Sequence, residues 1–155
     1  MTSLEDRVRS LEARLVELQD VRAIEALAAR YHTLCDGGWD GRSHDDLEAL
    51  VALWVPDGVY RINAARPPCR GHDEIRDQFV RLRTSMPWIL HTLMNPEVVV
   101  RGDTASARFK AVAYYRREGG SHVVVGSYDG ELARTPEGWR FTSWVADLAH
   151  GSVLS

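Results

Sequence analysis

The sequence has few cysteines, no long apolar run and no excess of positive charge. Its two cysteines, Cys35 and Cys69, are too few for a disulfide scaffold, and we expect both to be free thiols in a reducing cytoplasm. No apolar stretch approaches the length that crosses a bilayer. The first residues carry a charge every two or three positions, unlike a signal peptide. These absences favour a cytoplasmic protein without a membrane partner.

Charge and composition also argue against nucleic-acid binding. The formal net charge is −3 and the isoelectric point is near 6.1, whereas nucleic-acid-binding domains usually present a basic face. Arginines greatly outnumber lysines, but they are scattered along the chain. The 155 residues, 45% hydrophobic and 26% charged, suit one globular domain with a substantial core.

Motifs that hold metals or nucleotides are missing. The sequence has no His-x-x-x-His, no paired Cys-x-x-Cys and no carboxylate-rich loop, so we expect no metal site. It also lacks a glycine-rich phosphate loop and a Gly-x-Ser-x-Gly elbow. Cys35 has no evident activating partner. Any chemistry is therefore expected to use side chains alone, with no cofactor.

Residues 1–20 predict a helical arm. Apolar residues recur there at alternating intervals of four and three, which is heptad spacing, and charged residues fill most positions between them. About two and a half heptads are too short for a stable coiled coil alone. We expect the arm to pack on a partner subunit or back on its own domain. The apolar seam consists of Leu4, Val8, Leu11, Leu15 and Leu18.

Two further helices are expected after the arm. From Val21 the apolar positions form a wider stripe, which is typical of a core-facing helix. The sequence CDGG at 35–38 is expected to end this helix. Asp45 or Asp46 is expected to cap a second helix that runs to about Val55.

The next segment alternates between turns and short elements. Residues 56–58 predict a turn, residues 59–63 a short strand and the proline pair at 67–68 a rigid loop. A third helix, with acidic residues in its first turn, is expected from Gly71 to near Met86.

The remainder of the chain predicts long strands joined by tight glycine turns. Such strands form an antiparallel meander. Because helices come first and strands after, the fold class is α+β, with helices on one face of a curved sheet. The expected strands span residues 88–100, 104–116, 121–134 and 139–148.

Five stretches occur in a familiar order: RYHTLCDGGWD, LEALVALWVPDGVY, GHDEIRDQF, ILHTLMNPEVVVRGDTASARF and GSYDGELARTPEGWRF. This order resembles the SnoaL-like branch of the nuclear-transport-factor-like superfamily, over about residues 21–148. Within it the chain is similar to scytalone dehydratase, bile-acid dehydratase and hexachlorocyclohexane dehydrochlorinase. The resemblance implies a cone-shaped barrel over residues 21–155, formed by a curved antiparallel sheet and packed by helices. It also implies a homo-oligomer, a dimer or trimer, and the arm gives a separate reason to expect one.

The resemblance further implies a pair of catalytic side chains. The dehydratase-type enzymes pair an aspartate at the end of the first long helix with a histidine early in the first long strand, and here these are Asp36 and His91. A neutral imidazole accepts a proton near neutral pH, while a carboxylate fixes its tautomer and stabilises the imidazolium. Without the resemblance, Asp36 fits a polar turn residue better, and His91 fits a strand histidine bonded to the backbone better.

Several polar residues are candidates to bind substrate. Tyr31 holds the place of a family tyrosine, and Tyr60 is the candidate on the short strand; taken alone, each fits an ordinary half-buried tyrosine better. A second family histidine has no match here, and Tyr115 is the candidate to replace it. Asn95 shares a sheet face with His91 unless a bulge intervenes, so it either orients substrate or caps that bulge. His32 is expected to point elsewhere around its helix.

Aromatic and small residues suggest a pocket. Between residues 105 and 115 alanines alternate with Phe109 and Tyr115, which leaves room for a ligand cavity or for close helix packing. Trp54, Tyr128 and Trp144 are further candidates to line a pocket for a flat or hydrophobic substrate, although such residues are also common in cores.

Together these features predict a cofactor-independent lyase or cyclase. His91 would remove a proton from a small, largely apolar, cyclic or carbonyl-bearing substrate, as in a dehydratase, cyclase or isomerase. The alternative is a non-catalytic module for small-molecule binding or oligomeric assembly. Epoxide hydrolysis would need a set of carboxylates and an arginine around a water, which the sequence does not assemble.

Overall fold

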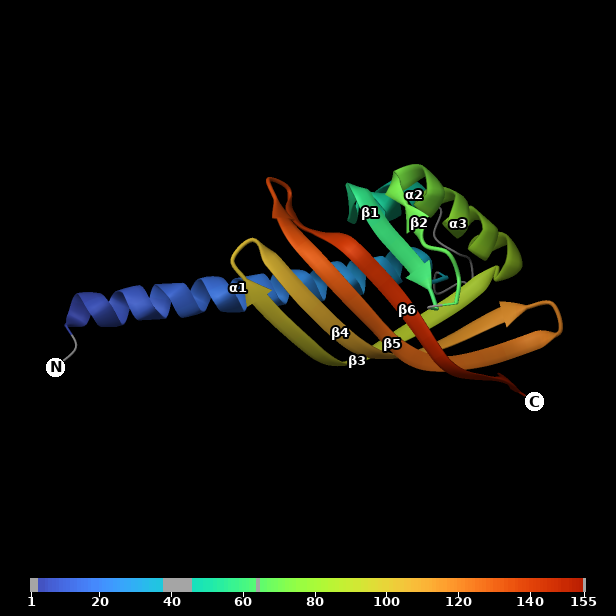
Figure 1. Cartoon of the computed structure of the whole chain (residues 1–155). Coiled ribbons are helices and arrows are strands. Elements are labelled where there is room, and N and C mark those ends of the chain that lie inside the picture. Colours follow the sequence, from blue (N-terminus) through green and yellow to red (C-terminus); the bar gives the residue numbers. More distant parts are fainter. Residues whose placement is uncertain (1–2, 38–45, 64, 155) are drawn as a thin grey trace.

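A curved six-stranded sheet packs against a long N-terminal helix in the computed structural model (Figure 1). The structure describes residues 3–37, 46–63 and 65–154. The helices are α1 (Leu4–Cys35), α2 (Leu47–Val51) and α3 (Gly71–Ser85). The strands are β1 (Trp54–Ile62), β2 (Cys69–Arg70), β3 (Trp88–Arg101), β4 (Thr104–Arg117), β5 (Gly120–Thr135) and β6 (Gly138–Leu154).

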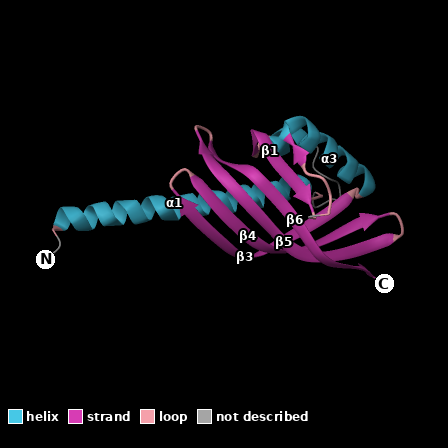
Figure 2. Cartoon of the chain, in the orientation of Figure 1, coloured by secondary structure: helices cyan, strands magenta, loops and turns pink. Residues whose placement is uncertain are grey.

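The α+β class is confirmed, and the sheet is mixed and open. The strand order is β2-β1-β6-β5-β4-β3, so β2 and β3 are free edges rather than neighbours in a closed barrel. Strands β3 to β6 form the expected antiparallel meander, whereas β1 pairs with β6 in parallel. Helix α1 passes behind the long strands (Figure 2), and α2 and α3 lie at one end of the sheet (Figure 1).

The second helix is shorter than the sequence predicts. Asp46 caps α2 by accepting a hydrogen bond from the Ala49 amide at 2.8 Å, but the helix ends at Val51 instead of about Val55. Trp54 already belongs to β1, where it pairs with Phe141 of β6. The prediction was wrong because residues 50–54 are nearly all buried, so their apolar spacing fits a helix and a strand equally. Gly38 and Asp45 lie outside the described residues.

Helix α1 joins the predicted arm and the core-facing helix into one element of 32 residues. Its N-terminus is closed by a capping box, in which the Ser3 hydroxyl accepts from the Asp6 amide at 3.1 Å. Residues 3–19 are exposed, and this half projects beyond the sheet (Figure 1). Over the described residues, no helix combines the length and apolarity needed to span a membrane.

Asp20 anchors α1 where the helix passes from solvent to core. Its carboxylate accepts hydrogen bonds from Arg134 Nη1 at 2.8 Å and Nη2 at 2.7 Å, and from Trp139 Nε1 at 3.1 Å. The hydrogen bonds from Arg134 lower the pKa of Asp20 despite its burial. One side chain thus fixes the helix to both strands of the β5–β6 hairpin.

Glycine shapes the inner face of the sheet. A Cβ placed on Gly130 in β5 would lie 2.7 Å from the Trp144 ring of β6, so only glycine lets the indole pack flat on the strand. Trp144 in turn stacks on Tyr128, with ring centroids 5.3 Å apart. This packing sets one wall of the cavity described below.

We expect Asp20→Ala to lower the free energy of unfolding by about 2 kcal/mol, because the buried Trp139 indole N–H loses its acceptor. Urea denaturation at neutral pH measures the change. Glu25→Ala is the matched control on the same helix, since it removes only the ion pair with the largely exposed Arg22 and should leave stability almost unchanged. Equal effects of the two substitutions would contradict the anchoring role of Asp20.

Candidate active site

The end of α1 is held against the edge strand β3. Asp36 follows the helix with extended backbone, and its amide donates to the His32 carbonyl at 2.7 Å. The next amide, of Gly37, donates to the Ile89 carbonyl at 2.7 Å. Because β3 has no neighbouring strand on this side, residues 36–37 cover its open backbone groups.

Asp36 and His91 form a hydrogen-bonded pair. Asp36 Oδ1 accepts from the His91 backbone amide at 3.0 Å and from His91 Nδ1 at 2.6 Å. An ionised carboxylate only accepts hydrogen bonds, so Nδ1 carries the proton and, in the neutral ring, Nε2 keeps its lone pair. The His91 side chain is 6% exposed and the Asp36 side chain 14%, so bulk water has little access to the pair.

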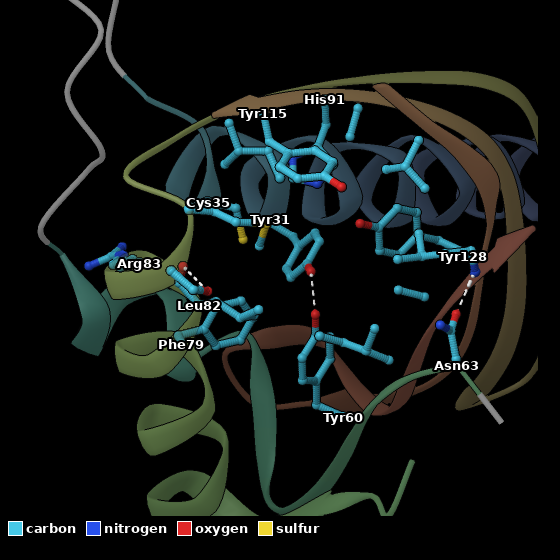
Figure 3. Close-up of a pocket in the computed structure, with 18 of the residues that line it drawn as sticks. Tyr31, Cys35, Tyr60, Asn63, Phe79, Leu82, Arg83, His91, Tyr115 and Tyr128 are labelled. Atoms are coloured by element: carbon cyan, nitrogen blue, oxygen red, sulfur yellow. Dashed lines mark hydrogen bonds between the residues drawn. The ribbon is translucent and has the colours of Figure 1, made fainter. Parts of the chain in front are cut away.

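His91 lines a cavity of about 360 Å³ between the end of α1, helix α3 and the inner face of the sheet. Figure 3 shows the lining side chains converging on this space. Four of the predicted residues, Tyr31, Tyr60, Tyr115 and Tyr128, line the same cavity as His91. Asp36 lies behind His91 and is not part of the lining.

Three buried tyrosines pack together at the cavity. The Tyr31 hydroxyl donates to the Tyr60 hydroxyl at 3.3 Å, and Tyr128 packs edge-on against Tyr31 with ring centroids 5.7 Å apart (Figure 3). Burial raises the pKa of Tyr31, Tyr60 and Tyr128, so all three keep their protons. They are therefore neutral groups that can donate hydrogen bonds rather than bases, and because a hydroxyl has one proton, Tyr31 donates either to Tyr60 or to a bound molecule.

Cys35 also reaches the cavity, as a neutral thiol. Burial raises its pKa, and no disulfide involves it. A buried thiol of this kind is a poor nucleophile.

His32 lies against His91, contrary to the expectation that it points elsewhere around the helix. The centroids of the two rings are 4.6 Å apart, and the centroid of the Tyr128 ring lies 4.8 Å from that of His32. His32 Nδ1 donates to the Ala28 carbonyl at 2.9 Å, whereas Nε2 has no hydrogen-bond partner among the described residues. Burial, and secondly the neighbouring His91, lower the pKa of His32. The His32 ring that packs against His91 is therefore a neutral imidazole.

The remaining candidates lie outside the cavity lining. Trp54, Phe109 and Trp144 are buried in the core. Asn95 is exposed in a bulge between Met94 and Glu97, with φ of 51°, a conformation that asparagine tolerates. The bulge breaks the alternation that would have placed Asn95 on the face of His91.

Helix α3 supplies cavity residues that the sequence did not single out. Phe79, Leu82 and Met86 come from its C-terminal half and the residue after it. The charged residues Arg66, Arg83 and Arg117 also line the cavity, and no aspartate or glutamate does so in the part of the chain that is described. Within residues 3–37, 46–63 and 65–154, no three His, Cys, Asp or Glu side chains converge as a metal site would require.

Comparison with known proteins places these features in a family context. A family profile described as a SnoaL-like domain matches residues 16–145. No curated protein sequence is significantly similar to the chain.

Solved structures from other proteins share the fold. An NTF2-like protein with a cystatin-like fold from Novosphingobium aromaticivorans is 32% identical, with a TM-score of 0.74, over 98% of this chain and 94% of that one. A candidate aromatic ring hydroxylase from the same organism is 28% identical, with a TM-score of 0.75, over 87% and 93% of the two chains. A type 2 hexachlorocyclohexane dehydrochlorinase is 16% identical over 92% and 93%, and its TM-score of 0.80 shows likeness of fold alone.

We expect the protein to lose stability as the pH falls below about 6.5, partly through His32. In that range the unfolded chain binds a proton at this position that the buried ring resists, so the unfolded state is favoured as pH falls. Urea denaturation at pH 7, 6 and 5 should show a smaller decline for His32→Leu than for the wild type. The exposed His150 provides the control His150→Leu, which should decline like the wild type. A His32→Leu variant with the full decline would contradict the buried neutral ring.

Proposed function

Because the chain belongs to the SnoaL-like domain family, we propose that it is a cofactor-independent lyase or cyclase in which His91 acts as general base. The observation that carries the proposal is the 2.6 Å hydrogen bond from His91 Nδ1 to Asp36 at the wall of the cavity. This bond leaves Nε2 as the nitrogen available to take a proton from a bound molecule.

The proposed reaction begins with proton removal. His91 Nε2 takes a proton from a carbon next to a carbonyl or a leaving group, and Asp36 stabilises the imidazolium that forms. The electron pair of the broken C–H bond then forms a double bond as hydroxide or halide leaves, moves within the substrate, or attacks a carbonyl carbon to close a ring. His91 gives the proton to the hydroxide as it departs, so that water is released, or to the rearranged or cyclised product; after loss of halide the proton goes to solvent.

Tyrosine hydroxyls stabilise the charge that develops on the substrate. Tyr31 is central in the cavity, between Tyr60 and Tyr128 (Figure 3). Since burial keeps these hydroxyls protonated, they donate hydrogen bonds to an oxyanion in surroundings of low dielectric constant, where such bonds are strongest.

The cavity favours a small cyclic substrate. A volume of about 360 Å³ lies at the lower end of the range for small-molecule sites. Aromatic and aliphatic side chains such as Phe79, Leu82 and Leu148 surround the tyrosines, which suits a largely apolar ring. The arginines of the lining also favour a substrate that bears or develops negative charge.

We expect the wild type to accelerate hydrogen–deuterium exchange at the α-carbon of small cyclic ketones, including β-hydroxy ketones, measured by proton NMR in D₂O. This assay detects proton removal whether elimination, cyclisation or isomerisation follows. His91→Ala and Asp36→Asn should each slow exchange by roughly 10²- to 10⁴-fold, because general-base catalysis is lost.

The matched control is Asn95→Gly, which keeps the positive φ and changes a polar residue outside the cavity. It should exchange at the wild-type rate. Wild-type exchange by a folded His91→Ala protein would exclude the mechanism. If the wild type binds the ketones but does not accelerate their exchange, the protein is instead a non-catalytic binding module.

We expect Tyr31→Phe to slow the same exchange by about 10²-fold, the effect of deleting one oxyanion donor. Tyr114→Phe is the control, because Tyr114 is adjacent to Tyr115 in sequence but is exposed on the opposite face of β4. Circular dichroism checks that both variants fold. An unchanged rate for Tyr31→Phe would remove Tyr31 from the catalytic machinery and leave it a structural residue.

A further inference from the structure

The N-terminal half of α1 exposes a complete apolar seam. The five side chains of this seam are 45–75% exposed, although burying an apolar side chain lowers the free energy. They are Leu4, Val8, Leu11, Leu15 and Leu18. They occupy successive d and a positions of a heptad, with leucine at every d and Val8 at the first a.

The protein's own domain cannot cover this seam. Helix α1 is continuous, and at about 100° per residue the seam lies on the side of the helix roughly 180° from the side buried by Asp20, Ile24, Leu27 and Tyr31. The sheet lies on that buried side, so the seam faces away from it. Folding back would require α1 to break.

The charges beside the seam are complementary to those of a second, identical helix. The g positions next to the seam are Arg7 and Arg14, and the e positions are Glu5, Glu12 and Gln19. In a parallel, in-register pair of identical helices, a g residue lies beside the e residue of the following heptad in the other helix. Arg7 of each copy would then meet Glu12 of the other.

The opposite orientation is disfavoured by the same charges. An antiparallel pair would place g beside g and e beside e, so that Arg7 meets Arg14 and Glu5 meets Glu12. Like charges at such positions repel. In the described chain neither Arg7 nor Glu12 forms an ion pair, so both are available.

We propose that the arm of α1 binds a second copy of this chain as a parallel, in-register, two-stranded coiled coil. Valine at an a position with leucines at d favours two strands. The seam is short, but the helix is already formed, because Ser3 caps its start and Asp20 anchors its other end. The cost of helix nucleation, which makes short coiled coils marginal, is therefore largely removed. This proposal is independent of the proposed chemistry.

Sedimentation equilibrium over a range of protein concentrations tests the pairing. The wild type should approach twice the 17.4 kDa chain mass. Leu15→Asp should raise the dissociation constant by about tenfold or more, because it buries charge in the seam.

Val16→Asp is the matched control. Val16 and Leu15 are neighbours with almost equal exposure, 54% and 55%, but Val16 lies outside the seam. Val16→Asp should therefore dimerise like the wild type. Circular dichroism verifies that both variants keep their helices.

Orientation is tested separately. With Leu4→Cys, oxidation should join two chains through position 4, because a parallel pair places these residues side by side. Arg7→Glu and Glu12→Arg should each weaken the dimer, and the two together should restore it.

The proposal is overturned by a monomer at every concentration, by a trimer, or by a dimer that Leu15→Asp leaves intact. Equal weakening by Leu15→Asp and Val16→Asp also overturns it. A dimer that depends on Leu15 but does not cross-link through position 4 excludes the parallel orientation.

Discussion

A single carboxylate oxygen joins the framework of this protein to its candidate chemistry. Asp36 Oδ1 accepts from both the backbone amide and the imidazole of His91, and so it fixes the end of α1, the edge of β3 and the orientation of the ring together. The Gly37–Ile89 hydrogen bond extends the same contact along the edge strand. Because the aspartate satisfies groups that would otherwise lie unpaired at a partly buried edge, the geometry of the pair follows from how the helix meets the sheet.

Burial then sets the protonation state of the groups around His91. The tyrosines and Cys35 keep their protons because ionisation would place a negative charge in apolar surroundings, and His32 stays neutral because protonation would place a positive one there. His91 differs from His32 in having a carboxylate on Nδ1. In the proposed mechanism, His91 with its counter-charge is the base and the neutral hydroxyls are the donors, which is the arrangement that proton abstraction and oxyanion stabilisation require.

Much of the fold follows from local sequence signals, and the cavity follows only in part. Glycine turns delimit the long strands, and the resemblance to SnoaL-like proteins, which the family profile confirms, identifies the Asp36–His91 pair. Alternation along β4 shows which residues point inward, but it does not separate cavity lining from solid core, so Phe109 was grouped with Tyr115. His32 was missed even though it lies four residues before Asp36 on the same helix face, a spacing that could have placed it beside His91. The lining from α3 depends on how that helix packs on β1, and no local pattern encodes this contact.

The tautomer of His91 decides whether its Nε2 is free to accept a proton. Long-range proton–nitrogen NMR, recorded at a pH where the ring is neutral, distinguishes the two ring nitrogens in the wild-type protein. We expect a single tautomer with the proton on Nδ1, donated to Asp36, and an unprotonated Nε2. A proton on Nε2, or the mixture of tautomers shown by a free imidazole, would contradict it.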